Sequence, residues 1–202
     1  MCTTRAILFD LGGVLLHYES RLVFEAIGRM GSSVSPWDVF GDPDAWQLQE
    51  RAESGELDPI GKTRELNRLF GLDAPEASWA QAWAAGCTRP VHGMMQLVAG
   101  LERQVVLGCL SNTVPWHWAA GLRLVPVLEA MPHHLLSYEL GCRKPGQRIY
   151  ELSLAALDLE GPEVVFVDDR PENIEGARGV GIRGVLFEGA EQLAAELAGL
   201  GL

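Results

Sequence analysis

The chain has 202 residues, of which 48% are hydrophobic and 21% charged, and its formal net charge is −11 at pH 7. This composition is typical of a globular protein with one domain, or one domain with an insertion, and excludes a disordered or fibrous chain. The acidic balance argues against a nucleic-acid partner, because binding to phosphate backbones requires a basic face.

The sequence also carries signals about membrane and compartment. No apolar run is long enough to cross a bilayer, so no membrane partner is expected. The N-terminus lacks the succession of charged, apolar and small residues that marks a secretory signal, and the expected location is therefore cytoplasmic. The cysteines are widely spaced without a CxxC pair, which favours reduced thiols. They are Cys2, Cys87, Cys109 and Cys142.

The first predicted element is a buried strand over residues 6–9. This short apolar run ends at Asp10 and is followed by the Gly12-Gly13 pair, which predicts a turn. Ligands of open α/β sheets bind where strands end, so Asp10 is a candidate for chemistry. An Asp that only caps the following turn is the alternative.

A helical insertion is predicted after this first strand. Between residues 19 and 89 the sequence shows helical spacing of apolar residues and no convincing strand. The expected helices cover residues 22–30, 45–52, 59–70 and 77–85. Glycine-containing turns separate them.

From residue 91 onward, strands and helices alternate. Strands are predicted at 105–110, 135–138, 164–167 and 183–187, and the one at 135–138 has the weakest pattern. Helices are predicted at 92–101, 115–122, 147–157, 171–179 and 190–197. This alternation predicts an α/β fold with a parallel sheet and right-handed crossovers.

Polar residues follow several of these strands. They are Asp10, the triplet Ser111-Asn112-Thr113, Lys144 in the loop of residues 141–146, and the pair Asp168-Asp169. Because the carboxyl ends of parallel strands meet at one edge of a sheet, these groups are expected to lie together.

The expected cluster of carboxylates predicts a cation. Asp10, Asp168 and Asp169 would repel one another unless a hard divalent ion joined them, and Mg²⁺ suits a site of few carboxylates. A carboxylate can also attack phosphorus and form an aspartyl phosphate. Phosphoryl transfer is catalysed mainly by positioning and charge neutralisation, which Ser111 and Lys144 would supply.

The segments FDLGGVL, LSNT, GCRKPGQRIY and FVDDRPENIEGARGVGIRG together resemble the four motifs of the haloacid dehalogenase superfamily, in the usual order. The SNT triplet, the RKP loop and DDxxxNIEGA resemble in particular the branch that contains bacterial α-D-glucose-1-phosphate phosphatase and the phosphatase domain of soluble epoxide hydrolase. The resemblance implies a Rossmann-like core of residues 1–16 and 91–202, with a small helical cap at residues 17–90.

The resemblance also implies roles for single residues. Asp10 is the implied nucleophile, and Lys144 the implied catalytic partner. The phosphoryl group is held by Ser111, Asn112 and Lys144, and Mg²⁺ by Asp10, Asp168, Asp169 and the backbone carbonyl of Gly12.

One position departs from the pattern of the superfamily's phosphatases. They typically carry a second Asp two residues after the nucleophile as general acid, and this chain has Gly12 there. General acid catalysis is typically worth about 10²- to 10⁴-fold. We therefore expect a preference for esters whose leaving group needs little protonation, such as sugar 1-phosphates, acyl phosphates or aryl phosphates. His17 or Glu19 could supply the proton instead, although an exposed polar turn is the simpler interpretation.

The leading hypothesis is a Mg²⁺-dependent phosphatase acting on a small phosphorylated metabolite, as a monomer or homodimer. A 2-haloacid dehalogenase would use the same nucleophile on carbon, but the Asp168-Asp169 pair argues against it. A phospho-accepting signalling domain would place its acidic pair at the first strand, unlike this chain. A catalytically weak binding protein of the same family is favoured only by Gly12.

Overall fold

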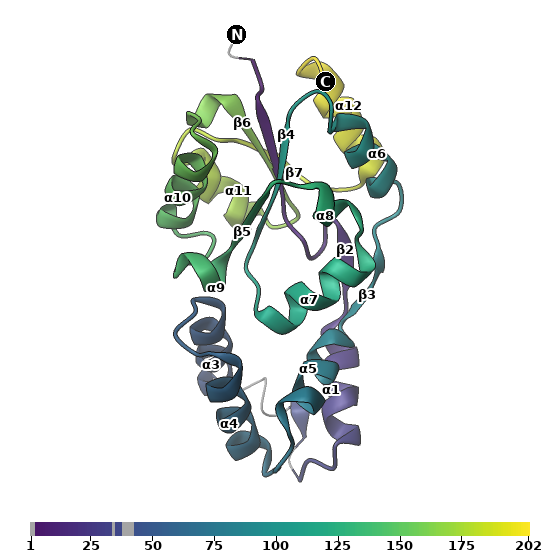
Figure 1. Ribbon diagram of the computed structural model, residues 1–202, viewed down its shortest axis with the longest axis vertical. Helices are drawn as coiled ribbons and strands as arrows, with labels where there is room; N and C mark the ends of the chain where they lie inside the picture. Colours follow the sequence, from purple (N-terminus) through teal and green to yellow (C-terminus); the bar gives the residue numbers. More distant parts are fainter. Residues whose placement is uncertain (1–2, 34, 38–42) are drawn as a thin grey trace.

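The computed structural model describes residues 3–33, 35–37 and 43–202. Its centre is a parallel sheet with the strand order β5-β4-β1-β6-β7 (Figure 1). The strands are β1 (Ala6–Phe9), β4 (Val106–Ser111), β5 (His133–Leu136), β6 (Val164–Asp168) and β7 (Arg183–Leu186). The predicted fold class, an α/β core with a parallel sheet flanked by helices, is confirmed.

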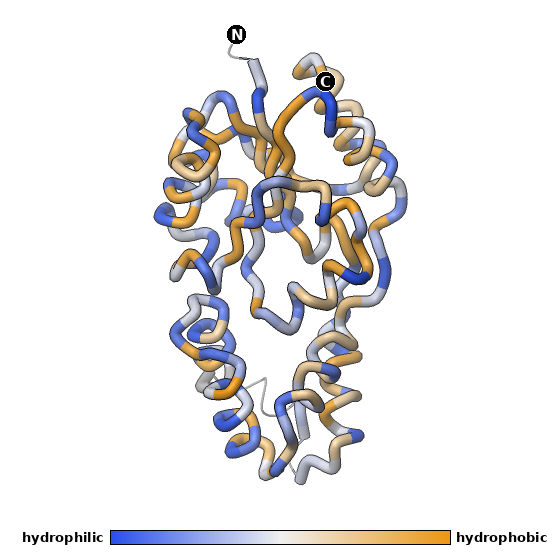
Figure 2. Tube along the Cα trace, viewed as in Figure 1, coloured by the Kyte–Doolittle hydropathy of each residue, from blue (hydrophilic) through white to orange (hydrophobic). Residues whose placement is uncertain are grey.

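Alternating residues of β1 face two hydrophobic clusters, because successive side chains of a strand point to opposite faces. Ile7 and Phe9 pack in one cluster with helices α6 (Met94–Leu101) and α12 (Ala190–Gly199). Ala6 and Leu8 pack in the other, with α10 (Gln147–Leu157) and α11 (Pro171–Arg178). The central strands are accordingly among the most hydrophobic segments in Figure 2. Burial on both faces explains why β1 reads as a continuous apolar run.

A second group of helices lies beyond the carboxyl end of the sheet (Figure 1). These helices are α1 (Ser20–Arg29), α3 (Pro43–Glu53), α4 (Pro59–Phe70) and α5 (Glu76–Ala84). They share a hydrophobic cluster of their own, which includes Ile27, Phe70 and Trp79 and reaches Trp116 of α7 (Pro115–Leu124). All four helices overlap the predicted ones. We call this group the cap helices, and the cap boundaries at residues 17 and 90 stay a prediction.

Two short strands connect the cap helices to the core. Leu16–Tyr18 (β2) pairs antiparallel with Cys87–Pro90 (β3), where the chain leaves the core and returns to it. The sequence pattern predicts no strand between residues 19 and 89, and β3 shows that this prediction is wrong. The pairing joins segments about seventy residues apart, so no local periodicity announces it.

The weakest predicted strand lies two residues earlier than expected. Strand β5 ends at Leu136, and Ser137 and Tyr138 already belong to the short helix α9 (Ser137–Leu140). β5 is an edge strand, and its first residues, His133 and His134, are polar. The apolar pattern therefore begins only at Leu135, after the strand has started. The remaining short elements are α8 (Val127–Ala130) and the 3₁₀ turn η1 (Gly161–Glu163).

The cysteines and the helix lengths bear on two further expectations. Cys87, Cys109 and Cys142 are free thiols, and Cys2 lies outside the described residues. Among the described helices, none combines the length and the apolar character needed to cross a bilayer.

Candidate active site

Asp10 lies at the centre of the sheet edge. Its strand β1 is hydrogen-bonded to β4 on one side and β6 on the other, with Phe9 level with Cys109 and Val167. The Asp10 amide continues the ladder by donating to the Val167 carbonyl at 2.9 Å. This register brings Ser111 at the end of β4 and Asp168 at the end of β6 to either side of Asp10.

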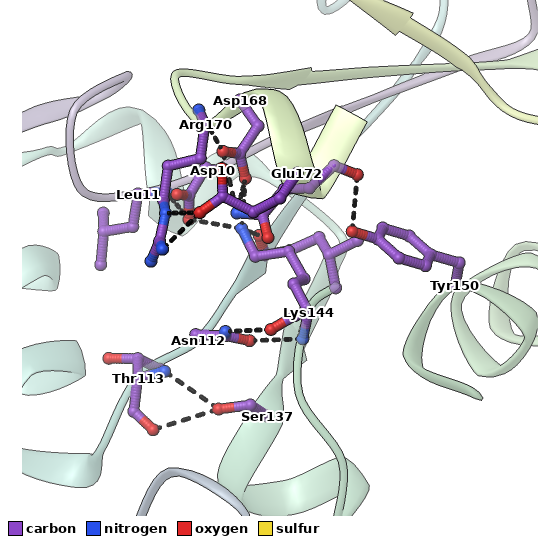
Figure 3. A network of polar contacts seen from close by, with 12 residues as sticks. Asp10, Leu11, Asn112, Thr113, Ser137, Lys144, Tyr150, Asp168, Arg170 and Glu172 are labelled. Atoms are coloured by element: carbon purple, nitrogen blue, oxygen red, sulfur yellow. Dashed lines mark hydrogen bonds and ion pairs between the residues drawn. The ribbon is translucent and has the colours of Figure 1, made fainter. Parts of the chain in front are cut away.

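Lys144 is buried between these strand ends and donates in three directions. Its Nζ lies 2.9 Å from Oδ1 of Asp10, 2.6 Å from Oδ2 of Asp168 and 3.0 Å from the carbonyl oxygen of Leu110 (Figure 3). An ammonium group has three donors, and all three are thus satisfied. The geometry fixes the Lys144 charge between two carboxylates that come from different strands.

Asp168 is held by more donors than any other carboxylate of the site. Besides Lys144, Nδ2 of Asn173 donates to both carboxylate oxygens at 3.0 Å, and the Arg170 amide donates to Oδ1 at 2.9 Å. Asn173 is itself fixed, because its carbonyl accepts a 2.7 Å bond from the Tyr150 hydroxyl. Asp168 is therefore a rigid anchor for Lys144.

Asn112 holds the backbone of Lys144. Its Nδ2 donates to the Lys144 carbonyl and its Oδ1 accepts from the Lys144 amide, both at 2.8 Å (Figure 3). Next to it, the Thr113 amide donates to the Ser137 hydroxyl at 3.0 Å. The expected role of Asn112 in substrate binding stays a prediction, and Asn112 lines the cavity. Its amide group also orients the loop that carries Lys144, a contact across 32 residues that no local pattern reveals.

Burial and neighbouring charges shift the pKa values of the site. Burial raises the pKa of Asp10 to about 6, although the Lys144 charge opposes the shift. Burial also disfavours the charged form of Lys144, but the carboxylates of Asp10 and Asp168 outweigh it, so the Lys144 pKa is raised. Burial and the Asp168 charge raise the pKa of Asp169. Asp10 is consequently still mostly ionised at neutral pH.

Asp10, Asp168 and Asp169 could hold a metal ion. Each offers one oxygen, and these three oxygens lie within 4.8 Å of one another. With Lys144 as the counter-charge, three carboxylates leave a formal charge of −2, which suits a divalent cation. An all-oxygen donor set of this kind is preferred by Mg²⁺. The residues present therefore fit the expected metal.

The absence of a side chain at Gly13 leaves room for the Asp169 carboxylate. Gly13 has φ +84°, and a Cβ added there would lie 2.1 Å from Oδ2 of Asp169. Only glycine allows this approach and this backbone conformation together. The Gly12-Gly13 pair predicted a turn. It did not predict the contact with Asp169, because the two residues are far apart in the sequence.

These groups open into a cavity of about 670 Å³ between the sheet edge and the cap helices. Its polar lining includes Asp10, Gly12, Ser111, Lys144 and Asp169. His17 and Glu19 are not among the described residues that line it. Large aromatic rings also line it, namely Tyr18, Phe24, Trp37, Trp46 and Trp83.

Arg143 and His117 also line the cavity. Arg143 forms ion pairs with Glu50 at 2.9 Å and with Glu53 at 2.8 Å, both on α3. Nε2 of His117 is buried and has no hydrogen-bond partner among the described residues. Burial, together with the Lys62 charge, lowers the pKa of His117 to about 3, so this imidazole is neutral at physiological pH.

The parallel sheet, the acidic edge with its buried lysine and the cap helices define this protein as a hydrolytic enzyme with a Rossmann-like α/β core. Comparison with known families agrees with this class. The family model of the haloacid dehalogenase-like hydrolases matches residues 4–181, and the chain belongs to this family.

Three known proteins are similar over most of the chain. A sesquiterpene phosphatase of Aspergillus oryzae is 28% identical over 191 residues, covering 92% of this chain and 91% of that protein. D-ribitol-5-phosphate phosphatase of Bacteroides thetaiotaomicron is 25% identical over 181 residues, covering 87% of each chain. A crystal structure of a haloacid dehalogenase family enzyme from B. thetaiotaomicron, in complex with magnesium and inorganic phosphate, has a TM-score of 0.83. It is 22% identical and covers 92% of this chain and 95% of that one.

Proposed function

We propose that this protein is a Mg²⁺-dependent phosphatase that hydrolyses a small phosphorylated metabolite through an aspartyl phosphate at Asp10. The observation that carries the proposal is the contact of Lys144 with both Asp10 and Asp168, beside an acidic cluster that suits a divalent ion. The two phosphatases that cover nearly the whole chain support the same reaction class.

The proposed reaction has two steps. An oxygen of the Asp10 carboxylate attacks phosphorus, the bond from phosphorus to the ester oxygen breaks, and the leaving group departs with that electron pair. Water then attacks phosphorus, the bond to Asp10 breaks, and phosphate and the free carboxylate result, with the water's proton passing to solvent. Mg²⁺ bound by the acidic cluster would neutralise charge on the phosphoryl oxygens.

Several residues position these groups in the proposal. Lys144 and the Leu11 amide both donate to Oδ1 of Asp10, at 2.9 and 2.7 Å, which orients the carboxylate. Lys144 and Ser111 face the phosphoryl group in this assignment, and Asp168 keeps Lys144 in place. Asp10, Asp168, Asp169 and the Gly12 carbonyl are assigned to the metal.

Phosphate release from phenyl phosphate tests the function. We expect release in the presence of Mg²⁺, loss in EDTA with recovery on adding Mg²⁺, and no turnover by Asp10→Asn. Chloride release from 2-chloropropionate in EDTA would instead favour a dehalogenase. No release of phosphate from any ester by the wild-type protein would favour the catalytically weak binding protein. The expected monomer or homodimer stays a prediction.

A further inference from the structure

The cavity that contains Asp10 is also lined by aromatic rings that remain open to solvent. Trp46 is 59% exposed, Trp37 56% and Tyr18 41%, although all three line the cavity. Leaving large apolar rings in water costs free energy that a covering ligand would recover. The exposed rings therefore favour an apolar group as the usual occupant beside them.

Contacts behind the rings hold several of them in place. Phe24 and Trp37 meet edge to face with centroids 4.6 Å apart. Trp83 contacts Trp79 at 6.0 Å, and the Lys62 ammonium lies 4.4 Å from the Trp83 ring centroid. A preformed wall of this kind binds a flat ligand with little loss of side-chain freedom.

Several polar side chains of the cavity wall and of the cap helices behind it are bonded to one another. Gln49 accepts from Nζ of Lys62 and donates to Glu53, both at 2.8 Å. Glu53 also accepts from Arg143 at 2.8 Å, and Arg143 pairs with Glu50. Because these bonds use the local cations and amides, a second anionic group or a polyol would have to break them to be bound.

No effective proton donor for the leaving group is supplied by four residues of the described cavity wall, namely Gly12, Tyr18, Cys87 and His117. Gly12 has no side chain, and the imidazole of His117 has already lost its acidic proton at neutral pH. Burial raises the pKa of the Cys87 thiol to about 11 and that of the Tyr18 phenol still further, so neither is an effective acid. These four residues therefore favour an ester whose leaving group departs as an anion.

We infer that the substrates of this site are aryl phosphates, in which a flat apolar ring carries the phosphate ester. The inference rests on the proposed function and deepens it. The ring packs between Trp37, Trp46 and Tyr18, while the phosphoryl group lies at Asp10 and Lys144. As the bond between phosphorus and the aryl oxygen breaks, the electron pair stays on that oxygen. The resulting phenolate takes its proton from water afterwards.

A series of four esters separates the two expected causes of the preference for aryl phosphates, which are the acidity of the released alcohol and the packing of its ring. Phenyl and cyclohexyl phosphate are similar in size but differ in the acidity of the alcohol released. Phenyl and 2-naphthyl phosphate release alcohols of similar acidity but differ in ring area. D-Glucose 1-phosphate represents the polyol leaving groups. We expect kcat/KM to be about tenfold higher for 2-naphthyl than for phenyl phosphate, since a stacked ring contributes on the order of this factor. Cyclohexyl phosphate and D-glucose 1-phosphate should be the poorest substrates.

Trp46→Ala tests the wall, and Ile60→Ala is its control. Both side chains belong to the cap helices and are more than half exposed, at 59% and 63%, so neither truncation should unfold the protein. Ile60 does not line the cavity. We expect Trp46→Ala to reduce the ratio of kcat/KM between 2-naphthyl and phenyl phosphate from about ten to about two, and Ile60→Ala to leave it unchanged.

The possible outcomes distinguish a failure of the aryl phosphate inference from a failure of the proposed phosphatase function. Phosphate release that depends on Asp10, with a naphthyl to phenyl ratio near one in both wild type and Trp46→Ala, would overturn the aryl assignment only. Faster turnover of D-glucose 1-phosphate than of 2-naphthyl phosphate would do the same. Absence of phosphate release from all four esters would overturn the proposed function itself.

Discussion

Arg143 donates from Nε to Oε2 of Glu53 at 2.8 Å, and so joins the loop that carries Lys144 to helix α3 of the cap. The two side chains are 29% and 13% exposed, which places the pair at the cavity wall rather than in the open solvent. Together with the ion pair between Arg143 and Glu50, this contact links the Lys144 loop to helix α3.

Neutralising either partner should weaken turnover modestly. We expect Arg143→Gln or Glu53→Gln to lower kcat/KM for phenyl phosphate by about two- to fivefold, because a partly exposed pair contributes about 0.2–1 kcal/mol. The double variant should lose no more than one single variant, which a double-mutant cycle measures. Arg148→Gln, in an exposed pair with Glu151, is the control. Strictly additive losses would contradict the coupling.

Gly13→Ala should impair metal binding specifically. The added methyl group would meet Oδ2 of Asp169 at 2.1 Å and displace that carboxylate. Gly31→Ala is a matched control, because Gly31 has a similar φ of +86° but nothing within 4 Å of an added Cβ. Both variants should lose about 1–2 kcal/mol of stability from backbone strain. Only Gly13→Ala should lose the rise in melting temperature that Mg²⁺ produces. An equal Mg²⁺ effect in both would refute the role of Gly13.

Gly12→Asp should extend the range of leaving groups. A Cβ at Gly12 would meet only the Cβ of Tyr18, at 3.9 Å, so a side chain fits. The new carboxyl group can protonate a poor leaving group, and we expect kcat for cyclohexyl phosphate to rise about 10²-fold. Phenyl phosphate should change little. Gly12→Asn has the same size without the acid and should give no rise. A gain shared by the Asn variant would argue against proton transfer.

Lys62 should make the stability of the protein depend on pH. Burial lowers the pKa of this ammonium group from 10.5 to about 7, although the Glu53 charge opposes the shift. Above about pH 7 the folded protein has therefore released a proton that the unfolded chain still binds, and stability rises with pH. Below about pH 7 both states are protonated, and the buried charge imposes its full cost.

Lys62→Met should remove this dependence. We expect the variant to be more stable than the wild type at about pH 6, because an apolar replacement of a buried charge is often stabilising. Its advantage should shrink above about pH 7, by at most about 1.4 kcal/mol per pH unit. Urea denaturation of both proteins at several pH values measures the difference between their free energies of unfolding. Contributions from other titrating groups are the same in both proteins and cancel in this difference. Arg64→Met, exposed on the same helix, should show no such trend. A constant difference across pH would contradict the depressed pKa.

The main elements and the location of the site were accessible from the sequence because both have local signatures. Continuous apolar runs predicted the buried strands β1 and β6, and the polar residues directly after them had to meet at one edge of a parallel sheet. Helix α10 was predicted with its observed ends, since its apolar spacing is regular from Gln147 to Leu157. Asp10, Ser111 and the Asp168-Asp169 pair were identified in this way.

Contacts between segments that are distant in the sequence could not be predicted from local sequence patterns. No sequence pattern predicts that the Asn112 side chain binds the backbone of Lys144. The pairing of β2 with β3 and the approach of Asp169 to Gly13 likewise depend on chain segments that meet only after folding.

The tryptophans of the helical insertion show what the sequence determines and what only the tertiary structure decides. The sequence by itself determined the α/β core, the chemistry of its strand ends and the presence of a helical insertion, because periodicity and strand termini are local properties. It left the four tryptophans of that insertion equivalent. Only the tertiary structure buried Trp79 and Trp83 in the cap and left Trp37 and Trp46 exposed at the cavity. The side of a helix that meets the core depends on how the packed elements are placed in space, and this arrangement is a property of the whole fold.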